Sequence, residues 1–356
     1  MNLLLLDQFS DPGGAQRCLL DLLPAVRAMG WKALVGLPGD GELFARVGEL
    51  GIETAHITCG PRENAARFAA RTPELARQID TLAQQIRADA VYVNGPRLLP
   101  GVALGRPRVP VVFHSHSLVP AGVMRRVAGA CLRRLEARVI GSCRFVAEQW
   151  RGFVPPERVR VIYNGVTGPE RVGRRPRVPR IGCVGRIAPE KGQLAFIAAA
   201  RRIHGVLQGC RFVIYGAALF RSPEAAAYEA EVRAAAEGLP VEFAGWSDDV
   251  YGALAELDVL LVPSAAQEAT TRVIMEAFAA GVPAIAFASG GIGEVITPGH
   301  DGFLVNSVEE MAARAIEVVR RPDCGLAERA RETWRTRFGL ERYRCEVIAT
   351  LQEISS

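Results

Sequence analysis

The stretch "LDVLLVPSAAQEATTRVIMEAFAAGVPAIAFA", residues 257–288, decides the fold. It opens with an apolar run, continues with apolar residues at helical spacing, and closes with a second apolar run. Thr270 or Thr271 is a suitable N-cap for the helix, and Gly281 followed by Pro283 is typical of a helix end. The stretch therefore predicts a strand, a loop, a helix and a second strand, and the continuous apolar strands are typical of a parallel sheet.

The same alternation runs through both halves of the chain. Helical patterns such as residues 14–29 and 63–87 separate short apolar runs, which predicts an α/β fold of two doubly wound parallel sheets. The predicted strands of the first half lie at residues 3–6, 33–37, 55–57, 90–95, 109–115, 138–142 and 159–165, and those of the second half at 180–186, 211–216, 241–245, 258–263, 283–288 and 302–305.

The two halves are predicted to be separate domains. The chain of 356 residues is long enough for two, and "GPERVGRRPRVPR" (168–180) has the Pro, Gly and Arg content of a linker. We expect a Rossmann-like domain at 1–167 and a second at 181–340. Residues 341–356 belong to an ending that the pattern predicts to be wholly helical from residue 325 to 354. Ligands of such sheets bind in the cleft at the carboxyl ends of the strands.

Composition excludes several classes of protein. No apolar run is long enough to span a bilayer, the first residues lack the basic flank of a secretion signal, and the eight cysteines form no C-x-x-C pair or Cys/His cluster. These features favour a cytoplasmic protein with reduced thiols. The net charge of +5 is uneven, with about +6 in residues 1–170 and about −1 in the remainder, and a basic first half suits an anionic acceptor or membrane surface. No basic stripe alternates with aromatic residues, so nucleic acid is not an expected partner.

A cationic loop is the first candidate site. In "VGRIAPEKGQ" (184–193), Arg186 and Lys191 flank a turn between a strand and a helix, and Lys191 is one of two lysines in the chain, the other being Lys32. Cations beside a helix N-terminus suit a diphosphate. The alternative is a pair of solvated surface cations.

Two glycine-rich turns are further candidates. Gly13 and Gly14 follow the first strand and open the first helix, and Gly290 and Gly291 follow a strand of the second half. Glycine lets a ligand approach the main chain closely. An ordinary tight turn explains either motif equally simply, and no G-x-G-x-x-G fingerprint follows any strand, which counts against an NAD enzyme.

Two histidines end a predicted strand in "VVFHSHS" (111–117). A metal pair would need further ligands, but no carboxylate or thiol cluster accompanies His114 and His116. We therefore interpret His116 as one polar active-site histidine. The sequence also has no D-x-D triplet, so we invoke no metal and no cofactor. The cations at Arg186 and Lys191 could perform the charge neutralisation instead.

Together these motifs resemble one family. Glu268 and Glu276 with seven residues between them, "VGRIAPEKG", "VIYNGV", "GGIGEV" and "PGHDGFLV" resemble the retaining glycosyltransferases of family 4, which have the GT-B fold. "PGGAQ" and "HSHS" match the family's first domain more loosely. The resemblance covers nearly the whole chain. It departs from the family at Thr270 and Thr271, where many relatives have Phe-Gly.

The resemblance implies a role for each matching residue. Glu268 would hold hydroxyls of a donor sugar and Glu276 the ribose of its nucleotide, while Arg186 and Lys191 would neutralise the leaving diphosphate. His116 would contact the donor sugar near the reacting carbon. The remaining residues of the expected donor site are Gly13, Gly14, Asn164, Thr270, Thr271, Gly290 and Gly291; a structural role suits Asn164 equally well, and a threonine hydroxyl could bind phosphate or cap the helix. The last helix would cross back onto the first domain.

The expected activity follows from the resemblance. The enzyme would move a hexose-type sugar, with UDP as the favoured carrier, to an acceptor hydroxyl with retention of configuration and without a metal. The acceptor would be a sugar, a lipid-linked compound or a small molecule, as in the biosynthesis of bacterial glycans or glycoconjugates. Three alternatives remain: a nucleotide-sugar epimerase, a phosphorylase, and a non-catalytic nucleotide-sugar-binding protein.

A basic segment raises the question of membrane contact. "MRRVAGACLRRLEARV" (124–139) combines five arginines with apolar residues and could lie peripherally on an anionic membrane, at its inner face in the cell. A partly solvated helix of the first domain is the alternative.

Overall fold

The computed structural model describes residues 1–11, 13–60, 65–170, 178–218, 223–264, 268–322 and 325–355. It divides into two compact units. Unit 1 comprises Met1–Gly165 together with Leu340–Ser356, and unit 2 comprises Val166–Gly339. The central part of the predicted linker, residues 171–177, lies outside the described residues.

Unit 1 is built on a seven-stranded sheet with the order β3-β2-β1-β4-β5-β6-β7, in which every pairing is parallel. The doubly wound architecture expected for the first half is therefore confirmed. Its strands are β1 (Asn2–Asp7), β2 (Lys32–Leu37), β3 (Glu53–His56), β4 (Ala90–Asn94), β5 (Val111–Ser115), β6 (Arg138–Gly141) and β7 (Val159–Val161).

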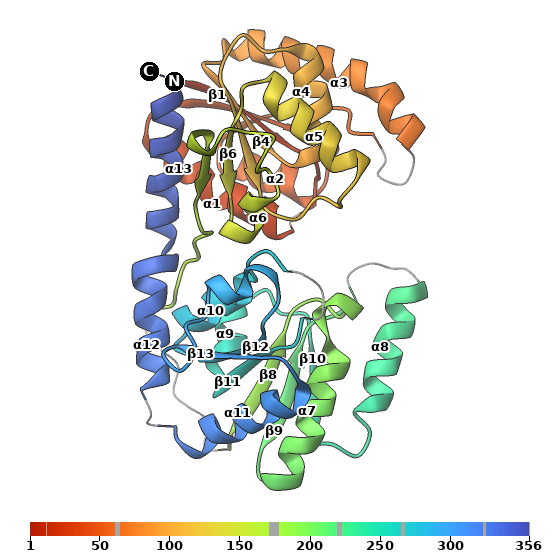
Figure 1. The fold of residues 1–356 in the computed structure, drawn as a ribbon, viewed down its shortest axis with the longest axis vertical. Coiled ribbons are helices and arrows are strands. Elements are labelled where there is room, and N and C mark those ends of the chain that lie inside the picture. Colours follow the sequence, from red (N-terminus) through yellow and green to blue (C-terminus); the bar gives the residue numbers. More distant parts are fainter. Residues whose placement is uncertain are drawn as a thin grey trace. The chain divides into compact units, whose positions relative to one another are not determined.

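Helices cover both faces of this sheet (Figure 1). Because successive strand residues point to opposite faces, Leu3 and Leu5 of β1 pack in one layer and Leu4 and Leu6 in the other. The first layer contains α1 (Gly14–Ala28), α2 (Glu42–Glu49) and α13 (Leu340–Ser355); the second contains α3 (Ala65–Ile86), α4 (Leu99–Gly105) and α5 (Val123–Arg134); the short α6 (Arg144–Glu148) precedes β7.

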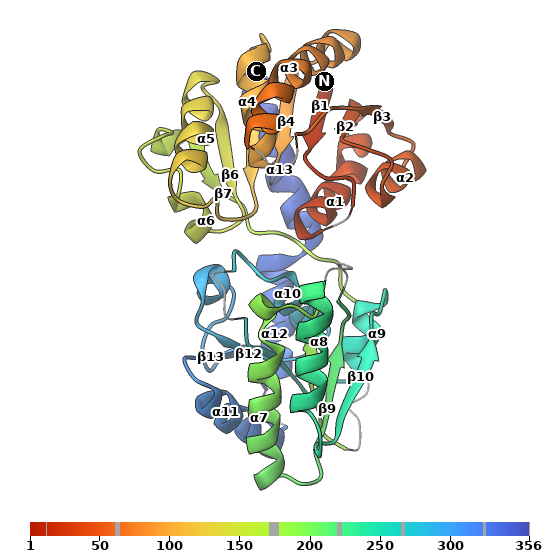
Figure 2. The same ribbon diagram turned by 90° about the vertical axis from the view of Figure 1, so that its right-hand side faces the viewer.

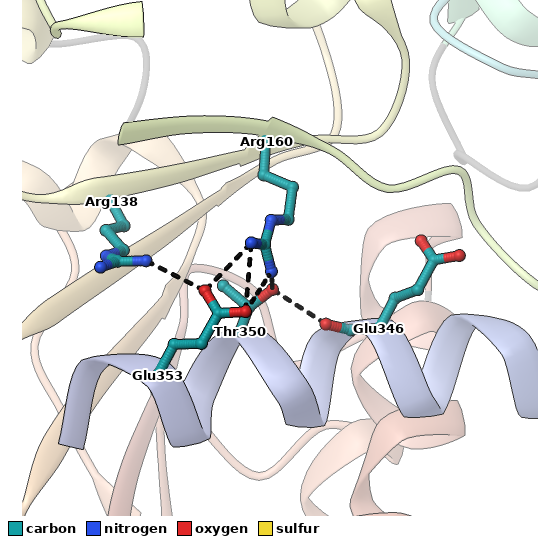
Figure 3. Close-up of polar contacts among 5 residues, drawn as sticks. All are labelled: Arg138, Arg160, Glu346, Thr350 and Glu353. Carbon is teal, nitrogen blue, oxygen red and sulfur yellow. Dashed lines mark hydrogen bonds and ion pairs between the residues drawn. The ribbon is translucent and has the colours of Figure 1, made fainter. Parts of the chain in front are cut away.

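The last helix, α13, belongs to unit 1 although it follows unit 2 in the chain. It packs against α1, and its Tyr343 hydroxyl donates to the Cys18 carbonyl at 3.1 Å. Near its end, Glu353 accepts three hydrogen bonds from Arg160 of β7 and one from Arg138 of β6 (Figure 3). Apolar packing and this arginine pair together hold the carboxyl end of the chain on the first sheet.

Unit 2 repeats the plan with a six-stranded parallel sheet of order β10-β9-β8-β11-β12-β13. Its strands are β8 (Arg180–Val184), β9 (Arg211–Tyr215), β10 (Val241–Gly245), β11 (Val259–Val262), β12 (Ala284–Phe287) and β13 (Gly302–Val305). The helices α7 (Gln193–Val206) and α8 (Pro223–Ala235) lie side by side with α11 (Val308–Arg320) on one face (Figure 2), and α10 (Arg272–Ala279) packs with α9 (Val250–Ala255) and α12 (Leu326–Thr333).

One helix prediction was wrong, and an open alternative is now decided. The ending is not one helix: a π-helical turn (Trp334–Phe338) follows α12, and Gly339 is extended because its backbone forms a bridge with Val166. In the basic segment 124–139, the helical alternative holds as far as Arg134, and the predicted strand 138–142 is confirmed. The chain reverses at Glu136, which has φ 49°, and Arg138 pairs with Val112 as the first residue of β6.

In the part of the chain that the structure describes, no helix is both long and apolar enough to cross a membrane.

Candidate active site

The loop after β8 is pressed against the end of β11. It contains a 3-10 turn, Pro189–Lys191, and ends at Gly192, whose φ of 74° favours glycine. A Cβ atom at Gly192 would lie 1.9 Å from the carbonyl oxygen of Pro263, so no larger residue fits there without displacing the backbone. The glycine thus holds Lys191 beside the carboxyl end of the neighbouring strand.

Lys191 meets Glu268 across this sheet edge. The ammonium and carboxylate lie 2.6 Å apart, and the side chains are 27% and 17% exposed. Arg186, the other predicted phosphate ligand, pairs with Glu190 of the same loop. Both predicted cations therefore lie at the carboxyl ends of the strands of unit 2, each against a carboxylate. Residues 265–267, directly before Glu268, lie outside the described residues.

The second glycine turn fixes the backbone of Glu268. Gly290 has φ 55°, and a Cβ atom there would lie 2.1 Å from the Glu268 carbonyl oxygen. The Gly291 amide donates to that same oxygen at 2.9 Å. The glycine pair thus shapes the segment that carries Glu268, and the Gly291 amide is already engaged in doing so. An open hollow of about 300 Å³ adjoins Gly290, with Ser264, Ser289 and Asn306 in its walls.

The start of α10 carries two buried hydroxyl groups. Thr271 is the N-cap residue, as one of the two predicted alternatives, but its side chain makes no capping hydrogen bond. Among the described residues, neither Thr270 Oγ1 nor Thr271 Oγ1 has a hydrogen-bond partner, although both side chains are buried. A buried hydroxyl without a partner is costly, and a helix N-terminus attracts anions. The two hydroxyls are therefore suited to an anionic ligand.

Glu276 lies on the second turn of α10, as expected. It is buried, and its carboxylate lies 3.6 Å from the Arg272 guanidinium one turn earlier. A carboxylate in this position can accept hydrogen bonds from a diol. The sequence interpretation overlooked Arg272, for which the i, i+4 spacing to Glu276 was the available signal.

Unit 1 has a separate polar cluster at the carboxyl ends of β1, β4 and β5. Asp7 accepts a hydrogen bond from Gln16 Nε2 at 2.8 Å and another from Asn94 Nδ2. Asn94 Oδ1 in turn lies 2.8 Å from His116 Nε2. Burial raises the pKa of Asp7 to about 6, against the hydrogen bonds from Asn94, Phe9 and Gln16, which lower it. Of this cluster the sequence had indicated His116 alone.

The other histidine of this strand is a core residue. His114 is fully buried, hydrogen-bonds the Tyr92 hydroxyl through Nδ1, and stacks on His116 with 3.9 Å between ring centroids. Burial, with His116 nearby, holds its pKa well below the usual value, so the ring stays neutral. The described residues contain no group of three His, Cys, Asp or Glu side chains arranged to hold a metal.

The remaining predicted residues lie in unit 1. Gly13 is the N-cap of α1, and its amide donates to Gln16 Oε1 at 3.2 Å; Gly14 is the exposed first residue of that helix. Asn164 is buried after β7, and the Arg342 guanidinium of α13 reaches its carbonyl at 3.5 Å. These contacts give Asn164 a structural position at the end of the unit.

Comparison with known proteins matches each unit to a family model of glycosyltransferases. The family model described as "Glycosyltransferase Family 4" matches residues 12–167, and the one described as "Glycosyl transferases group 1" matches residues 178–321.

Curated relatives match part of the chain. A 2-deoxystreptamine glucosyltransferase of Streptomyces kanamyceticus is 30% identical over 251 residues, which are 65% of this chain and 63% of that protein. A lipopolysaccharide 1,2-N-acetylglucosaminetransferase of Salmonella typhimurium is 25% identical over 234 residues, or 60% of this chain and 59% of that protein. The alignments thus span about three fifths of these relatives' own length.

Solved structures match the whole chain. HepE from Anabaena in complex with UDP superposes with a TM-score of 0.85 and 25% identity, covering 99% of this chain and 100% of that one. A sucrose-phosphate synthase of Thermosynechococcus elongatus, at 19% identity and a TM-score of 0.80, shares the fold. The GT-B architecture expected from the sequence is therefore confirmed.

Proposed function

Because the chain belongs to the glycosyltransferases, as the family models of both its domains show, we propose that it transfers a hexose-type sugar from a nucleoside-diphosphate sugar to an acceptor hydroxyl. The observation that carries the proposal is the cluster in unit 2. There Lys191 pairs with Glu268, which precedes α10 in the chain. The Thr270 and Thr271 hydroxyls at the start of that helix have no hydrogen-bond partner among the described residues.

The cluster divides into groups for the phosphates and groups for the two sugars. Lys191 and Arg186 supply positive charge for the diphosphate, and the Thr270 and Thr271 hydroxyls can donate to its oxygens. Glu268, held by the Gly290 turn, accepts from hydroxyls of the donor sugar. The buried carboxylate of Glu276 suits the ribose diol. The ion pairs of the present structure then exchange partners when the anionic donor binds.

UDP is the proposed carrier, and the proposed transfer retains the anomeric configuration. The support for UDP is the similarity to HepE, which was solved with UDP and with UDP-glucose. In the retaining reaction, the bond from the anomeric carbon to the diphosphate breaks. The acceptor oxygen bonds that carbon on the same face, and its proton passes to the departing phosphate oxygen. Preorganised cations that stabilise this developing charge are worth about 3–4 kcal/mol each. We propose that Arg186 and Lys191 do this without a metal ion.

The chain offers its own control for the test. Lys191→Ala should lower kcat about 100- to 1000-fold, because it removes one preorganised cation. Lys32→Ala, which changes the other lysine at an exposed position, should leave kcat unchanged. Turnover is measured with a panel of UDP-, GDP-, ADP- and TDP-sugars chosen by thermal shift, with and without EDTA. Equal turnover in both variants would refute the phosphate role, and loss of turnover in EDTA would refute the metal-free mechanism.

Product analysis in the same assay separates the rivals. A transferase forms a glycoside only when an acceptor is present, whereas an epimerase alters the donor without one. Glu276→Gln should weaken UDP binding, while Glu268→Gln should lower turnover more than affinity for free UDP. A donor that binds but is neither transferred nor hydrolysed with any acceptor would identify a binding protein and contradict the proposal.

We also propose that α5 rests on the anionic inner surface of the cytoplasmic membrane, beside a lipid-linked acceptor. Val123, Met124 and Val127 on its first turns are 69%, 54% and 45% exposed. Arg126, Arg133 and Arg134 are exposed on the same helix, which has no acidic residue. Exposed apolar side chains beside arginines suit an interface with anionic headgroups.

Vesicle co-sedimentation tests this contact. The protein should bind vesicles rich in phosphatidylglycerol and not those of phosphatidylcholine alone. The double variant Met124→Gln, Val127→Gln should lose binding. Val206→Gln, a matched change of a 53% exposed residue on α7, should not. Equal binding by both variants would refute the assignment to α5.

A further inference from the structure

The buried cluster of unit 1 fixes the orientation of one amide group. Asn94 Nδ2 donates to Asp7 Oδ2 and, at 3.2 Å, to the carbonyl oxygen of Ala15. Both of its hydrogens therefore face acceptors, and a flipped amide would place Oδ1 against a carboxylate. The carboxylate of Asp7 thus determines that Oδ1 of Asn94 is the atom that faces His116.

That orientation selects the tautomer of the histidine. Asn94 Oδ1 can only accept a hydrogen bond, and it lies 2.8 Å from His116 Nε2. Nε2 must therefore carry a proton, and a neutral His116 has its lone pair on Nδ1. The chain of interactions runs from Asp7 at the end of β1, through Asn94 at the end of β4, to His116 just beyond β5.

The loop of His116 is held from its other side as well. Gln149 Oε1 accepts from the Val119 amide at 2.7 Å, and Gln149 Nε2 donates to the Ser117 carbonyl at 3.0 Å. The His114 ring stacks on His116. These contacts hold the loop and one ring face of His116 in place. The hydrogen bond with Asn94 then determines which ring nitrogen of His116 carries the proton.

We propose that Asp7 and Asn94 are positioning residues that hold His116 in one orientation and in the Nε2–H tautomer. The functional part of this inference rests on the proposed glycosyl transfer, in which His116 contacts the donor sugar. Asp7 itself is fully buried and acts only through Asn94. Its charge is retained inside unit 1 although burial raises the pKa of this carboxyl to about 6. Costly buried charges of this kind are typical of functional sites.

The test is the imidazole ¹⁵N spectrum of histidine-labelled protein at about pH 8, where an ordinary imidazole is neutral. His116 is assigned by its absence in His116→Gln. Wild-type protein should show the Nε2–H pattern for His116. In Asp7→Asn, Oδ1 remains the acceptor for the Phe9 amide and for Gln16 Nε2, so the new Nδ2 group faces Asn94. Asn94 must then flip to accept from it, which turns Asn94 Nδ2 towards His116, so His116 should change to the Nδ1–H pattern.

Asp301→Asn is the matched control, because Asp301 is a second fully buried carboxylate, located in unit 2. It should leave the His116 spectrum unchanged. A folded Asp7→Asn protein that keeps the Nε2–H pattern would overturn the proposal. If Asp7→Asn does not fold, Asn94→Leu is the second variant, since it removes the acceptor altogether. A pure Nε2–H pattern in that variant would overturn the proposal equally.

Kinetics then separate this inference from the proposed function. Asp7→Asn should lower kcat about 10-fold or more with little change in the donor KM, because the histidine is misplaced while unit 2 still binds nucleotide. The spectra need no turnover, so the tautomer change can be observed even if no transferase activity exists. A transferase whose His116 tautomer is independent of Asp7 would retain the function and refute the relay.

Discussion

Some side chains in this protein suit the binding of a ligand better than the stability of the fold. Thr270 and Thr271 are the clearest case, because their hydroxyls are buried without a partner among the described residues. A side chain chosen for stability alone would not place a hydroxyl there, since burying a polar group without a hydrogen bond costs about 1–3 kcal/mol. The two hydroxyls therefore point to a ligand rather than to stability as the reason for threonine at these positions.

We expect Thr270→Val and Thr271→Val to lower nucleotide affinity without lowering stability. Valine has the shape of threonine and removes a hydroxyl that no group among the described residues satisfies, so the free energy of unfolding should stay equal or rise. A hydrogen bond to a charged phosphate contributes about 1.5–3 kcal/mol, or roughly a 10- to 100-fold change in Kd. Calorimetry with UDP and urea denaturation measure the two effects. Unchanged affinity in both variants would exclude a phosphate role for the hydroxyls.

Asp7 predicts an unusual dependence of stability on pH. Its pKa in the folded protein is about 6, above the ordinary value of 3.8, so the folded state binds the proton more tightly than the unfolded state. Below about pH 4 this difference adds about 3 kcal/mol to the free energy of unfolding, and the added stability is lost as the pH rises through 6. Urea denaturation from pH 4.5 to about 7.5 should show this loss in the wild type and not in Asp7→Asn. Parallel curves for the two proteins would contradict it.

At the scale of elements, the loops after the strands carry the site, and glycine determines how closely they approach. Gly192 and Gly290 both have positive φ and both lie against a carbonyl oxygen of a neighbouring loop or strand end. Side chains at these points would separate the Lys191 loop from β11 and the Gly290 turn from Glu268. Backbone contacts therefore assemble the cluster, and they bring the charged side chains of Lys191 and Glu268 together.

Two glycine substitutions test this element-level view. Gly192→Ala should destabilise the protein by about 2–5 kcal/mol, since it combines left-handed strain with a Cβ atom 1.9 Å from the Pro263 carbonyl. Gly205→Ala, in α7 with open space around it, should stabilise the protein by about 0.5–1 kcal/mol. Thermal denaturation measures both. Similar shifts for the two variants would mean that Gly192 is not confined as the structure shows.

The elements also show what sequence alone can and cannot predict. All thirteen predicted strands are present, because continuous apolar runs between helical patterns have few other solutions in an α/β protein. The helical alternative for the basic segment 124–139 overlapped the predicted strand 138–142, and the structure resolves the overlap by reversing the chain at Glu136. Asp7 and Asn94 could not be joined from sequence: they are 87 residues apart, and the parallel pairing of β1 with β4 brings them together.

At the scale of the whole molecule, each unit has its own core and its own polar cluster. The cationic loop, Glu268 and Glu276 all belong to unit 2, whereas Asp7, Asn94 and His116 belong to unit 1. The chain order does not follow this division, because α13 returns to unit 1 after unit 2 is complete. Unit 1 therefore depends on the last residues of the chain, and unit 2 does not.

We expect this division to be visible in thermal unfolding. Tyr343→Ala removes a fully buried aromatic ring of α13 and its hydrogen bond to Cys18, which should cost about 3–5 kcal/mol. The loss should lower the melting temperature of unit 1. The fluorescence of Trp150, a buried residue of that unit, measures this transition.

Saturating UDP should instead raise the melting temperature of unit 2, since a ligand stabilises only the species that binds it. Trp246, which is exposed in unit 2, reports that transition when Trp31, Trp150 and Trp334 are replaced by Phe. A shift of the unit 1 transition alone on adding UDP would place the nucleotide in the wrong unit and would contradict the assignment of Lys191, Glu268 and Glu276.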